Sequence, residues 1–278
     1  MRTVNLREKL LTGVFWLAAL AIAAILMVII GYVVLKGISS VNFEFLFSPP
    51  ARAGKEGGIS TTIISTLYLV LGSLVLAVPI GVASAVYLEE YAHKNSRFAY
   101  LVNLTAETLA GIPSIVFGLF GFVFFVIFLG WGWSILSGAM TMAIMILPTI
   151  TRTSQEAILA VPREYRENSL ALGAGKWQTI RKIVLPSALP GIATGIILSI
   201  GRAVGETAAL LLTAGSSLGM PASVTDPART MAVHLYILAM EGISMERAFG
   251  TAFVIILFIV IINYAAHYGM KRLFPLKK

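Results

Sequence analysis

Residues 108–151 read TLAGIPSIVFGLFGFVFFVIFLGWGWSILSGAMTMAIMILPTIT and contain no Asp, Glu, Lys or Arg. A helix needs about 20 apolar residues to cross the hydrocarbon core of a bilayer. These 44 residues are therefore long enough for two crossings. The sequence Gly130-Trp131-Gly132-Trp133 divides the run, because glycine interrupts helices and tryptophan prefers the membrane interface. The stretch indicates an integral membrane protein.

Four further stretches are long and apolar enough to cross a membrane. They are residues 10–35, 57–88, 187–212 and 248–270, of which only 187–212 contains charged residues. Over all 278 residues, 58% are hydrophobic and 12% are charged, and the mean hydropathy is +0.88. Soluble domains carry about 25% charged residues, so the composition excludes a soluble globule. We predict an all-α polytopic membrane protein with six transmembrane helices.

The distribution of basic residues predicts the orientation of these helices. With six crossings, both termini lie on one side of the membrane. That side carries 15 of the 21 Lys and Arg residues, and the other side carries five. Cytoplasmic loops are enriched in Lys and Arg, so both termini are predicted to be cytoplasmic. The basic C-terminal tail, with Lys271, Arg272, Lys277 and Lys278, is predicted to touch anionic lipid of the membrane.

The sequence offers little for catalysis or metal binding. There is no cysteine, and the histidines are His93, His234 and His267. Gly173-Ala174-Gly175-Lys176 resembles a phosphate-binding loop, but Leu170 and Trp177 stand where that motif requires Gly and Ser or Thr. We predict no catalytic residue, metal site or cofactor in this chain. The net charge of +8 follows from membrane topology, so no nucleic-acid partner is predicted.

Two parts of the chain are distinguished by their position. Residues 1–56 are predicted to form an N-terminal transmembrane helix with an outer loop, and residues 57–278 a five-helix core. The first apolar stretch is longer than the core of a signal peptide, so we expect this helix to be retained.

In the outer segment 213–247, Asp226-Pro227 is predicted to start a short helix over Met231 to Met240.

A motif lies in the predicted cytoplasmic loop of about residues 152–186. Glu167-Asn168-Ser169 is followed by three residues, Gly173, nine residues and Ile183-Val184-Leu185-Pro186. This pattern resembles the EAA signature of ABC importer permeases, although Asn168 and Ser169 replace its two alanines. The resemblance implies that Glu167, Leu172 and Gly173 belong to coupling helices that dock on a separate ATPase. Without it, the segment would be an ordinary basic loop beside the membrane.

Two charged residues fall inside the fifth apolar stretch. Arg202 and Glu206 are four residues apart, so on a continuous helix they share a face and can form an ion pair. Arg202 lies about 22 Å along that helix from Ser187, near or beyond the middle of the bilayer. Charges at that depth are costly and mark either a substrate pathway or a structural ion pair. Both interpretations remain open from the residues alone.

Two segments narrow the resemblance to phosphate ABC transporter permeases. Arg202-Ala203-Val204-Gly205-Glu206-Thr207 is similar to a segment typical of those proteins, and Gly111 to Leu119 is similar to their Pro-Ser-x-x-x-Gly-Leu stretch. The whole chain looks most like the A-type subunit, with a MetI-like core after one N-terminal helix. The resemblance implies that Arg202, Glu206, Thr207 and Ser114 line a substrate pathway.

The resemblance also implies a set of partners. They are two ABC ATPase subunits that bind ATP and magnesium, a second permease chain of the related C-type, and an extracytoplasmic phosphate-binding protein. The expected location is the inner membrane of a prokaryote. A permease for another oxyanion, such as phosphonate, sulfate or molybdate, is the main alternative. A secondary transporter is a further alternative, although it would usually have more helices and internal symmetry.

Glycines punctuate the fifth apolar stretch. Gly191 and Gly195 form one G-x-x-x-G pair, and Gly201 and Gly205 form another. Such pairs allow two helices to approach closely. The sequence does not decide whether either pair packs within this chain or against a second permease chain.

Overall fold

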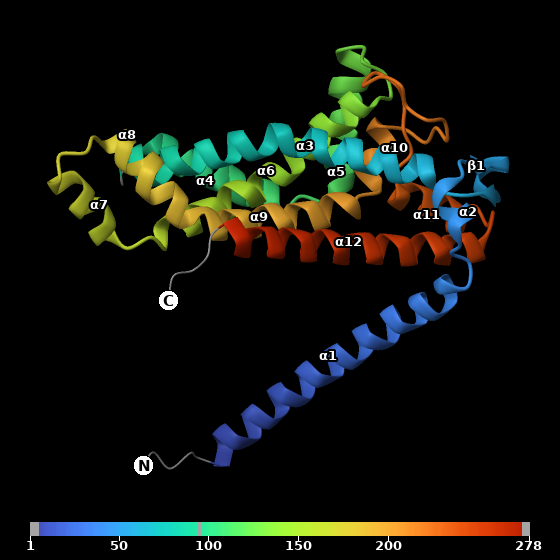
Figure 1. Ribbon diagram of the computed structural model, residues 1–278, viewed down its shortest axis with the longest axis horizontal. Coiled ribbons are helices and arrows are strands. Elements are labelled where there is room, and N and C mark those ends of the chain that lie inside the picture. Colours follow the sequence, from blue (N-terminus) through green and yellow to red (C-terminus); the bar gives the residue numbers. More distant parts are fainter. Residues whose placement is uncertain (1–5, 94–95, 274–278) are drawn as a thin grey trace.

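The computed structural model describes residues 6–93 and 96–273, which form an elongated helical bundle (Figure 1). Lys277 and Lys278 of the predicted lipid-binding tail lie outside the described residues. The long helices are α1 (Leu6–Ile38), α3 (Ser60–Val86), α6 (Ile135–Leu159), α9 (Leu185–Val204) and α12 (Met245–Leu273). Short π-helical turns continue α3 as η2 (Tyr87–Tyr91) and precede α9 as η4 (Ile180–Val184), after α8 (Lys176–Thr179).

The described residues contain five helices that are long and apolar enough to cross a membrane, or six when a bent pair is counted as one crossing. The bent pair consists of α4 (Arg97–Ala110) and α5 (Ser114–Gly121), which continues into the π-helical η3 (Phe122–Phe128). The two parts meet at an angle of 105°. The all-helical polytopic fold is therefore confirmed, but the predicted third crossing is a bent pair of helices that begins at Arg97.

Helix α6 lies at the centre of the bundle. In its most apolar stretch 67% of the residues are buried, whereas in α1 none are. The main core, which includes Leu69, Met142, Ile146 and Leu210, joins α6 to α3 and to α10 (Ala208–Thr213). Between membrane helices, close van der Waals packing of such side chains holds the bundle together, because lipid tails are as apolar as the side chains themselves.

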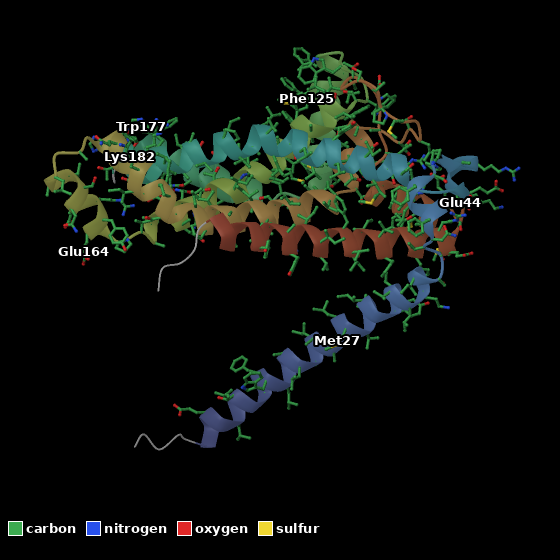
Figure 2. The ribbon with its side chains drawn as sticks, viewed as in Figure 1. Met27, Glu44, Phe125, Glu164, Trp177 and Lys182 are labelled. Atoms are coloured by element: carbon green, nitrogen blue, oxygen red, sulfur yellow. The ribbon has the colours of Figure 1, made fainter. Side chains whose placement is uncertain are left out.

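Helix α1 stands apart from the other helices. Figure 1 shows it leaving the bundle beside α2 and diverging along its whole length, and Met27, labelled in Figure 2, is 74% exposed. Contact with α12 is confined to its end. There Tyr32 meets the ring of Phe249 edge-on at 5.6 Å, and Gly37 leaves no room for a side chain beside Phe249 and Phe253.

The end of the bundle beside α2 (Phe43–Phe47) carries a small cap. Strands β1 (Pro50–Ala51) and β2 (Glu56–Gly57) pair antiparallel around the 3₁₀ turn η1 (Arg52–Gly54). Beneath this cap lies α11 (Met231–Met240), where His234 contacts Gly54 closely.

The start of α11 differs from the prediction. The side chain of Thr230 caps it by accepting from the amide of Val233 at 3.3 Å. Asp226 instead accepts from the amides of Ala222 and Ser223, both at 2.8 Å. The prediction of an Asp226-Pro227 helix start was therefore wrong, because this carboxylate closes a turn within the preceding loop.

The opposite end carries α7 (Arg163–Ala171) and α8 (Figure 1). The predicted loop of residues 152–186 is shorter than expected, because α6 remains helical to Leu159. In this last part of α6, the buried side chain of Gln155 donates to Glu89 and Asn103, and Arg152 forms an exposed ion pair with Glu107. A second core cluster, which includes Ile158, Ile180 and Val184, fixes the base of α7 and α8 on the bundle.

Candidate translocation and coupling sites

The helix that contains Arg202 is broken. Helix α9 ends at Val204, residues 205–207 are non-helical, and α10 begins at Ala208. The carboxylate of Glu206 is buried and accepts a 3.0 Å hydrogen bond from the amide of Ala209. It therefore satisfies one of the free amides at the start of α10, where a negative charge is favourable.

The ion pair that a continuous helix would allow between Arg202 and Glu206 is therefore not formed in the described residues. Within the described residues, Arg202 has neither an ion-pair nor a hydrogen-bond partner. It lies half-buried in the last turn of α9. A cation in this condition, inside a helix bundle, is available to a ligand or to another chain.

A second break lies in the third crossing. Helix α4 ends at Ala110, and α5 begins at Ser114 after Gly111, Ile112 and Pro113. Proline removes an amide donor and disfavours helical geometry in the residue before it. The backbone of Pro113 itself has ψ 141°, outside the helical range, so the helix is interrupted at this residue. Ser114 is the first residue of the new helix and is half-buried.

The short helices that follow the two breaks lie side by side. A Cβ on Gly118 of α5 would lie 2.8 Å from the Cα of Ala209 in α10, and a Cβ on Gly121 would lie 2.8 Å from the methyl group of Thr213. As the chain moves from Gly118 to Gly121 in α5, the residue in contact moves from Ala209 to Thr213 in α10. The two helices therefore run parallel. Their starting ends point the same way, with α5 beginning about 4.5 Å, or nearly one turn, before the level of Ala208.

The packing of α9 on α6 gives the depth of Arg202. Gly191 lies against Ala157 of α6 and Gly195 against Thr153, and beyond the break Leu210 lies against Gly138. This antiparallel register puts Arg202 level with Ile146. Ile146 is close to the midpoint of α6, so the unpaired guanidinium lies near the middle of the bundle.

The two glycine pairs of α9 have different surroundings. The Gly191–Gly195 pair packs within the chain against α6. A Cβ on Gly201 would meet nothing within 4 Å, and one on Gly205 would meet only carbonyl oxygens of α9 beyond 3.7 Å. The described part of this chain therefore leaves the side of α9 beside Arg202 open. Thr207 is half-buried at the same break.

The candidate coupling segment projects from one end of the bundle. Glu167 is exposed on α7, and Leu172 at the turn is 89% exposed. Gly173 has φ +84°, which only glycine adopts without strain. The hydroxyls of Ser169 and Thr179 hydrogen-bond at 2.9 Å across the turn. The reversal is therefore a fixed two-helix projection, and Figure 2 places Glu164 and Trp177 on it.

Arg166 anchors this projection and was not among the predicted site residues. Its guanidinium contacts the carboxylate of Glu90 at 2.8 Å and donates to the carbonyls of Ile158 and Val161 at 2.9 and 2.8 Å. These contacts join α7 to the ends of α3 and α6. The sequence shows only that Glu90 ends an apolar stretch, which indicates a boundary but does not identify a partner.

The other end of the bundle contains a buried basic pair. Arg229 donates to the carbonyl of Ser216 at 2.7 Å, and His234 is 1% exposed. Burial lowers the pKa of His234 to about 4, and the positive charge of Arg229 acts in the same direction. The His234 imidazole is therefore neutral at pH 7. Within the described residues, no group of three or more His, Asp or Glu side chains could hold a metal ion.

A charged residue at mid-depth beside broken helices, with an exposed projection at one end, is the architecture of a membrane transport subunit. Residues 77–276 match the family model described as "Binding-protein-dependent transport system inner membrane component". The chain belongs to this family and is the permease subunit of an ABC importer. Permeases of this family are non-enzymatic membrane components, and ATP hydrolysis takes place on a separate chain.

Relatives of known name cover most of the chain. A probable ABC transporter permease of Bacillus subtilis, YqgI, is 34% identical over 280 residues, which is 95% of both chains. The phosphate transport permease PstA of Haemophilus influenzae is 30% identical and covers 92% of this chain and 87% of its own length. PstA 1 of Mycobacterium tuberculosis strain CDC 1551 is 38% identical over 76% of this chain and 69% of its own.

Solved transporters share the fold. A chain of a bacterial alginate importer superposes with a TM-score of 0.67 over 98% of this chain and 99% of its own, at 17% identity. A chain of the inward-facing methionine transporter MetNI gives a TM-score of 0.62 over 77% of this chain and 94% of its own, at 19% identity. These similarities confirm a MetI-type architecture.

Proposed function

We propose that this permease forms half of the translocation path of an ATP-driven importer of inorganic phosphate. The observation that carries the proposal is Arg202, a half-buried guanidinium at mid-depth without a partner in the described residues. An anion that leaves water for a low-dielectric interior needs a compensating charge. The PstA relatives, at 30 to 38% identity, support phosphate as that anion.

Arginine suits a tetrahedral oxyanion because its planar fork donates two parallel hydrogen bonds to two oxygens. The hydroxyls of Thr207 and Ser114, at the two breaks, are further donors. Ser114 also begins a helix, whose free amides and dipole favour an anion. The open side beside Gly201 and Gly205 leaves room for the substrate next to Arg202.

Glu206 has a different role from these donors. Its carboxylate is held by the amide of Ala209 at the start of α10, so it stays fixed while the substrate passes. A negative charge near Arg202 lowers the local positive potential. The anion is then bound weakly enough to be released, which a lone buried guanidinium would prevent.

The projection formed by α7 and α8 would couple this path to an ATPase chain that binds ATP and magnesium. Glu167, Leu172 and Gly173 are the proposed contact residues, since they are exposed at or near the turn. The anchor at Arg166 ties α7 to α3 and α6. Movement of the projection would thus reach the helices that surround the path.

The remaining partners follow from the same proposal. A second permease chain of the related C-type would complete the path on the open side of Arg202. An extracytoplasmic phosphate-binding protein would dock at the end that carries the β1–β2 cap. Both termini and the coupling projection would then be cytoplasmic, in the inner membrane of a prokaryote, in agreement with the charge distribution.

The substrate is tested by reconstituting the chain with its partner permease, ATPase and binding protein in liposomes. ATP-dependent uptake of radiolabelled phosphate that excess sulfate or molybdate does not reduce is the expected result. Uptake of sulfate or molybdate in preference to phosphate would contradict the proposed substrate. The assignment to ABC permeases would survive such a result.

A further inference from the structure

A long apolar groove runs between α3 and α9 near the coupling projection. Its volume is about 650 Å³. Its lining residues are all apolar or aromatic: Val78, Pro79, Val82, Ala83, Val86, Tyr87, Tyr91, Trp177, Leu185, Leu189, Ile192 and Ile196. They recur at helical spacing on two neighbouring membrane helices, so the groove faces outward between them.

The length of the groove matches one leaflet of a bilayer. From Val78 to Tyr91 the α3 side rises about 20 Å at 1.5 Å per residue. Half of a hydrocarbon core is about 15 Å thick. One end of the groove therefore lies at the membrane surface, and its aromatic residues Tyr87, Tyr91 and Trp177 gather at that end. Tyrosine and tryptophan prefer this interface.

Positive charge lies at the same end of the groove. The Lys176 ammonium lies 4.8 Å from the ring centre of Tyr91, a lining residue. Arg181 and Lys182 are exposed and fall between Trp177 and Leu185 on the continuous helix Lys176–Val204. Figure 2 labels Trp177 and Lys182 together at this end of the bundle. Glu90 does not neutralise this cluster, because Arg166 holds its carboxylate.

We propose that the groove is a binding site for an anionic phospholipid of the leaflet next to the coupling projection. An acyl chain occupies the apolar groove, and the headgroup phosphate meets Lys176, Arg181 and Lys182. Basic pockets between membrane helices on the cytoplasmic side are suited to such headgroups.

The bound lipid would support the base of the coupling projection, since Trp177 lies on α8 and Tyr91 ends η2. The location of the headgroup in the cytoplasmic leaflet rests on the proposed orientation. The binding itself does not rest on the identity of the transported substrate. Lipid retention, measured without transport, therefore separates this proposal from the proposed function.

The test is to purify the assembled transporter in detergent and to quantify retained phosphatidylglycerol and cardiolipin by mass spectrometry. Each cation beside an anionic headgroup contributes about 1 kcal/mol, or roughly fivefold in affinity. The variant Lys176→Ala with Arg181→Ala and Lys182→Ala is expected to retain at least about tenfold less anionic lipid. Lys55→Ala, an exposed cation at the other end of the bundle, is the control and should retain lipid normally.

A second variant tests the groove without changing charge. Ala83→Trp fills the groove and should displace the lipid, whereas Ala19→Trp on the exposed surface of α1 should not. Unchanged anionic lipid in both the triple variant and Ala83→Trp would overturn the proposal. Crosslinking of Ala83→Cys to the second permease chain would also overturn it, because protein would then fill the groove. The chain has no other cysteine to confuse that result.

Discussion

The guanidinium of Arg166 and the carboxylate of Glu90 lie 2.8 Å apart, with their side chains only 21% and 10% exposed. The same guanidinium donates to the carbonyls of Ile158 and Val161 at the end of α6. Three elements therefore meet at one side chain: η2 after α3, the end of α6, and α7. Motion of α7 cannot be separated from the two central helices while these bonds persist.

Replacing Arg166 by Ala should loosen the projection and uncouple ATP hydrolysis from uptake. A hydrogen bond to a charged group contributes about 1.5–3 kcal/mol, and its loss here leaves Glu90 poorly solvated. Limited proteolysis of residues 160–175 should become at least about tenfold faster. Arg152→Ala is the matched control, because its pairs with Glu107 and Glu156 are exposed and contribute little. Equal proteolysis rates for the two variants would contradict the anchoring role.

The turn of the projection should tolerate a β-branched residue at Gly175 but not at Gly173. A Cβ at either position would meet nothing within 4 Å, but Gly173 has φ +84° and Gly175 has φ −72°. Left-handed geometry costs a residue with a side chain about 1–2 kcal/mol. Gly173→Val should therefore weaken co-purification of the ATPase, and Gly175→Val should leave it near normal. Equal loss of ATPase co-purification in both variants would contradict the role given to the left-handed backbone of Gly173.

The two glycine pairs of α9 should respond differently to leucine. Gly195→Leu would collide with Thr153 of α6 and should prevent accumulation of the folded chain. Gly201→Leu has open space in the described chain, so the chain should fold normally but transport poorly, because the side chain enters the proposed path. Chain yield and phosphate uptake measured together separate the two effects. Normal uptake with Gly201→Leu would place the path elsewhere.

His234 should make the end of the bundle that carries the β1–β2 cap sensitive to acid. Burial and the charge of Arg229 lower the pKa of His234 from 6.5 to about 4. Burial also lowers the pKa of Arg229, and the carboxylate of Glu241 opposes that effect. The pKa of His234 is lower in the folded state than in the unfolded state. The stability contributed by the neutral imidazole is therefore complete above pH 6.5 and is lost as the pH falls through about 4. The difference corresponds to about 3 kcal/mol. Thermal denaturation at pH 7 and pH 4 should show a smaller pH effect in His234→Gln than in the original chain.

The sequence predicted the membrane class and the chain reversal at Gly173 because both depend on local features. A run of about 20 apolar residues has few alternatives to a membrane helix. The left-handed conformation at Gly173 is likewise a local property of the backbone. Only contacts between distant segments could show that Arg166 meets Glu90, since these residues are 76 positions apart.

The breaks before α5 and α10 could not be predicted from the local sequence. Pro113 indicates a possible interruption, but a proline inside a membrane helix is often tolerated, and Pro148 and Pro190 lie inside α6 and α9. Nothing in residues 205–207 excludes a continuous helix, so the sequence could not show that Arg202 and Glu206 lie on separate helical segments. Contacts between segments that are far apart in the sequence favour the break. Gly118 and Gly121 of α5 have no side chain, so α10 can pack closely against them.

The central claim is that Arg202 serves the transported anion, and phosphate uptake by Arg202→Gln tests it most directly. Loss of a hydrogen bond to a charged group, about 1.5–3 kcal/mol, corresponds to a fall of about tenfold to more than a hundredfold in uptake rate. The complex should still assemble, because Arg202 has no partner in the described chain. Arg202→Lys should retain part of the activity, since a point charge replaces the bidentate fork. Full phosphate uptake by Arg202→Gln, at normal complex yield, would contradict the account.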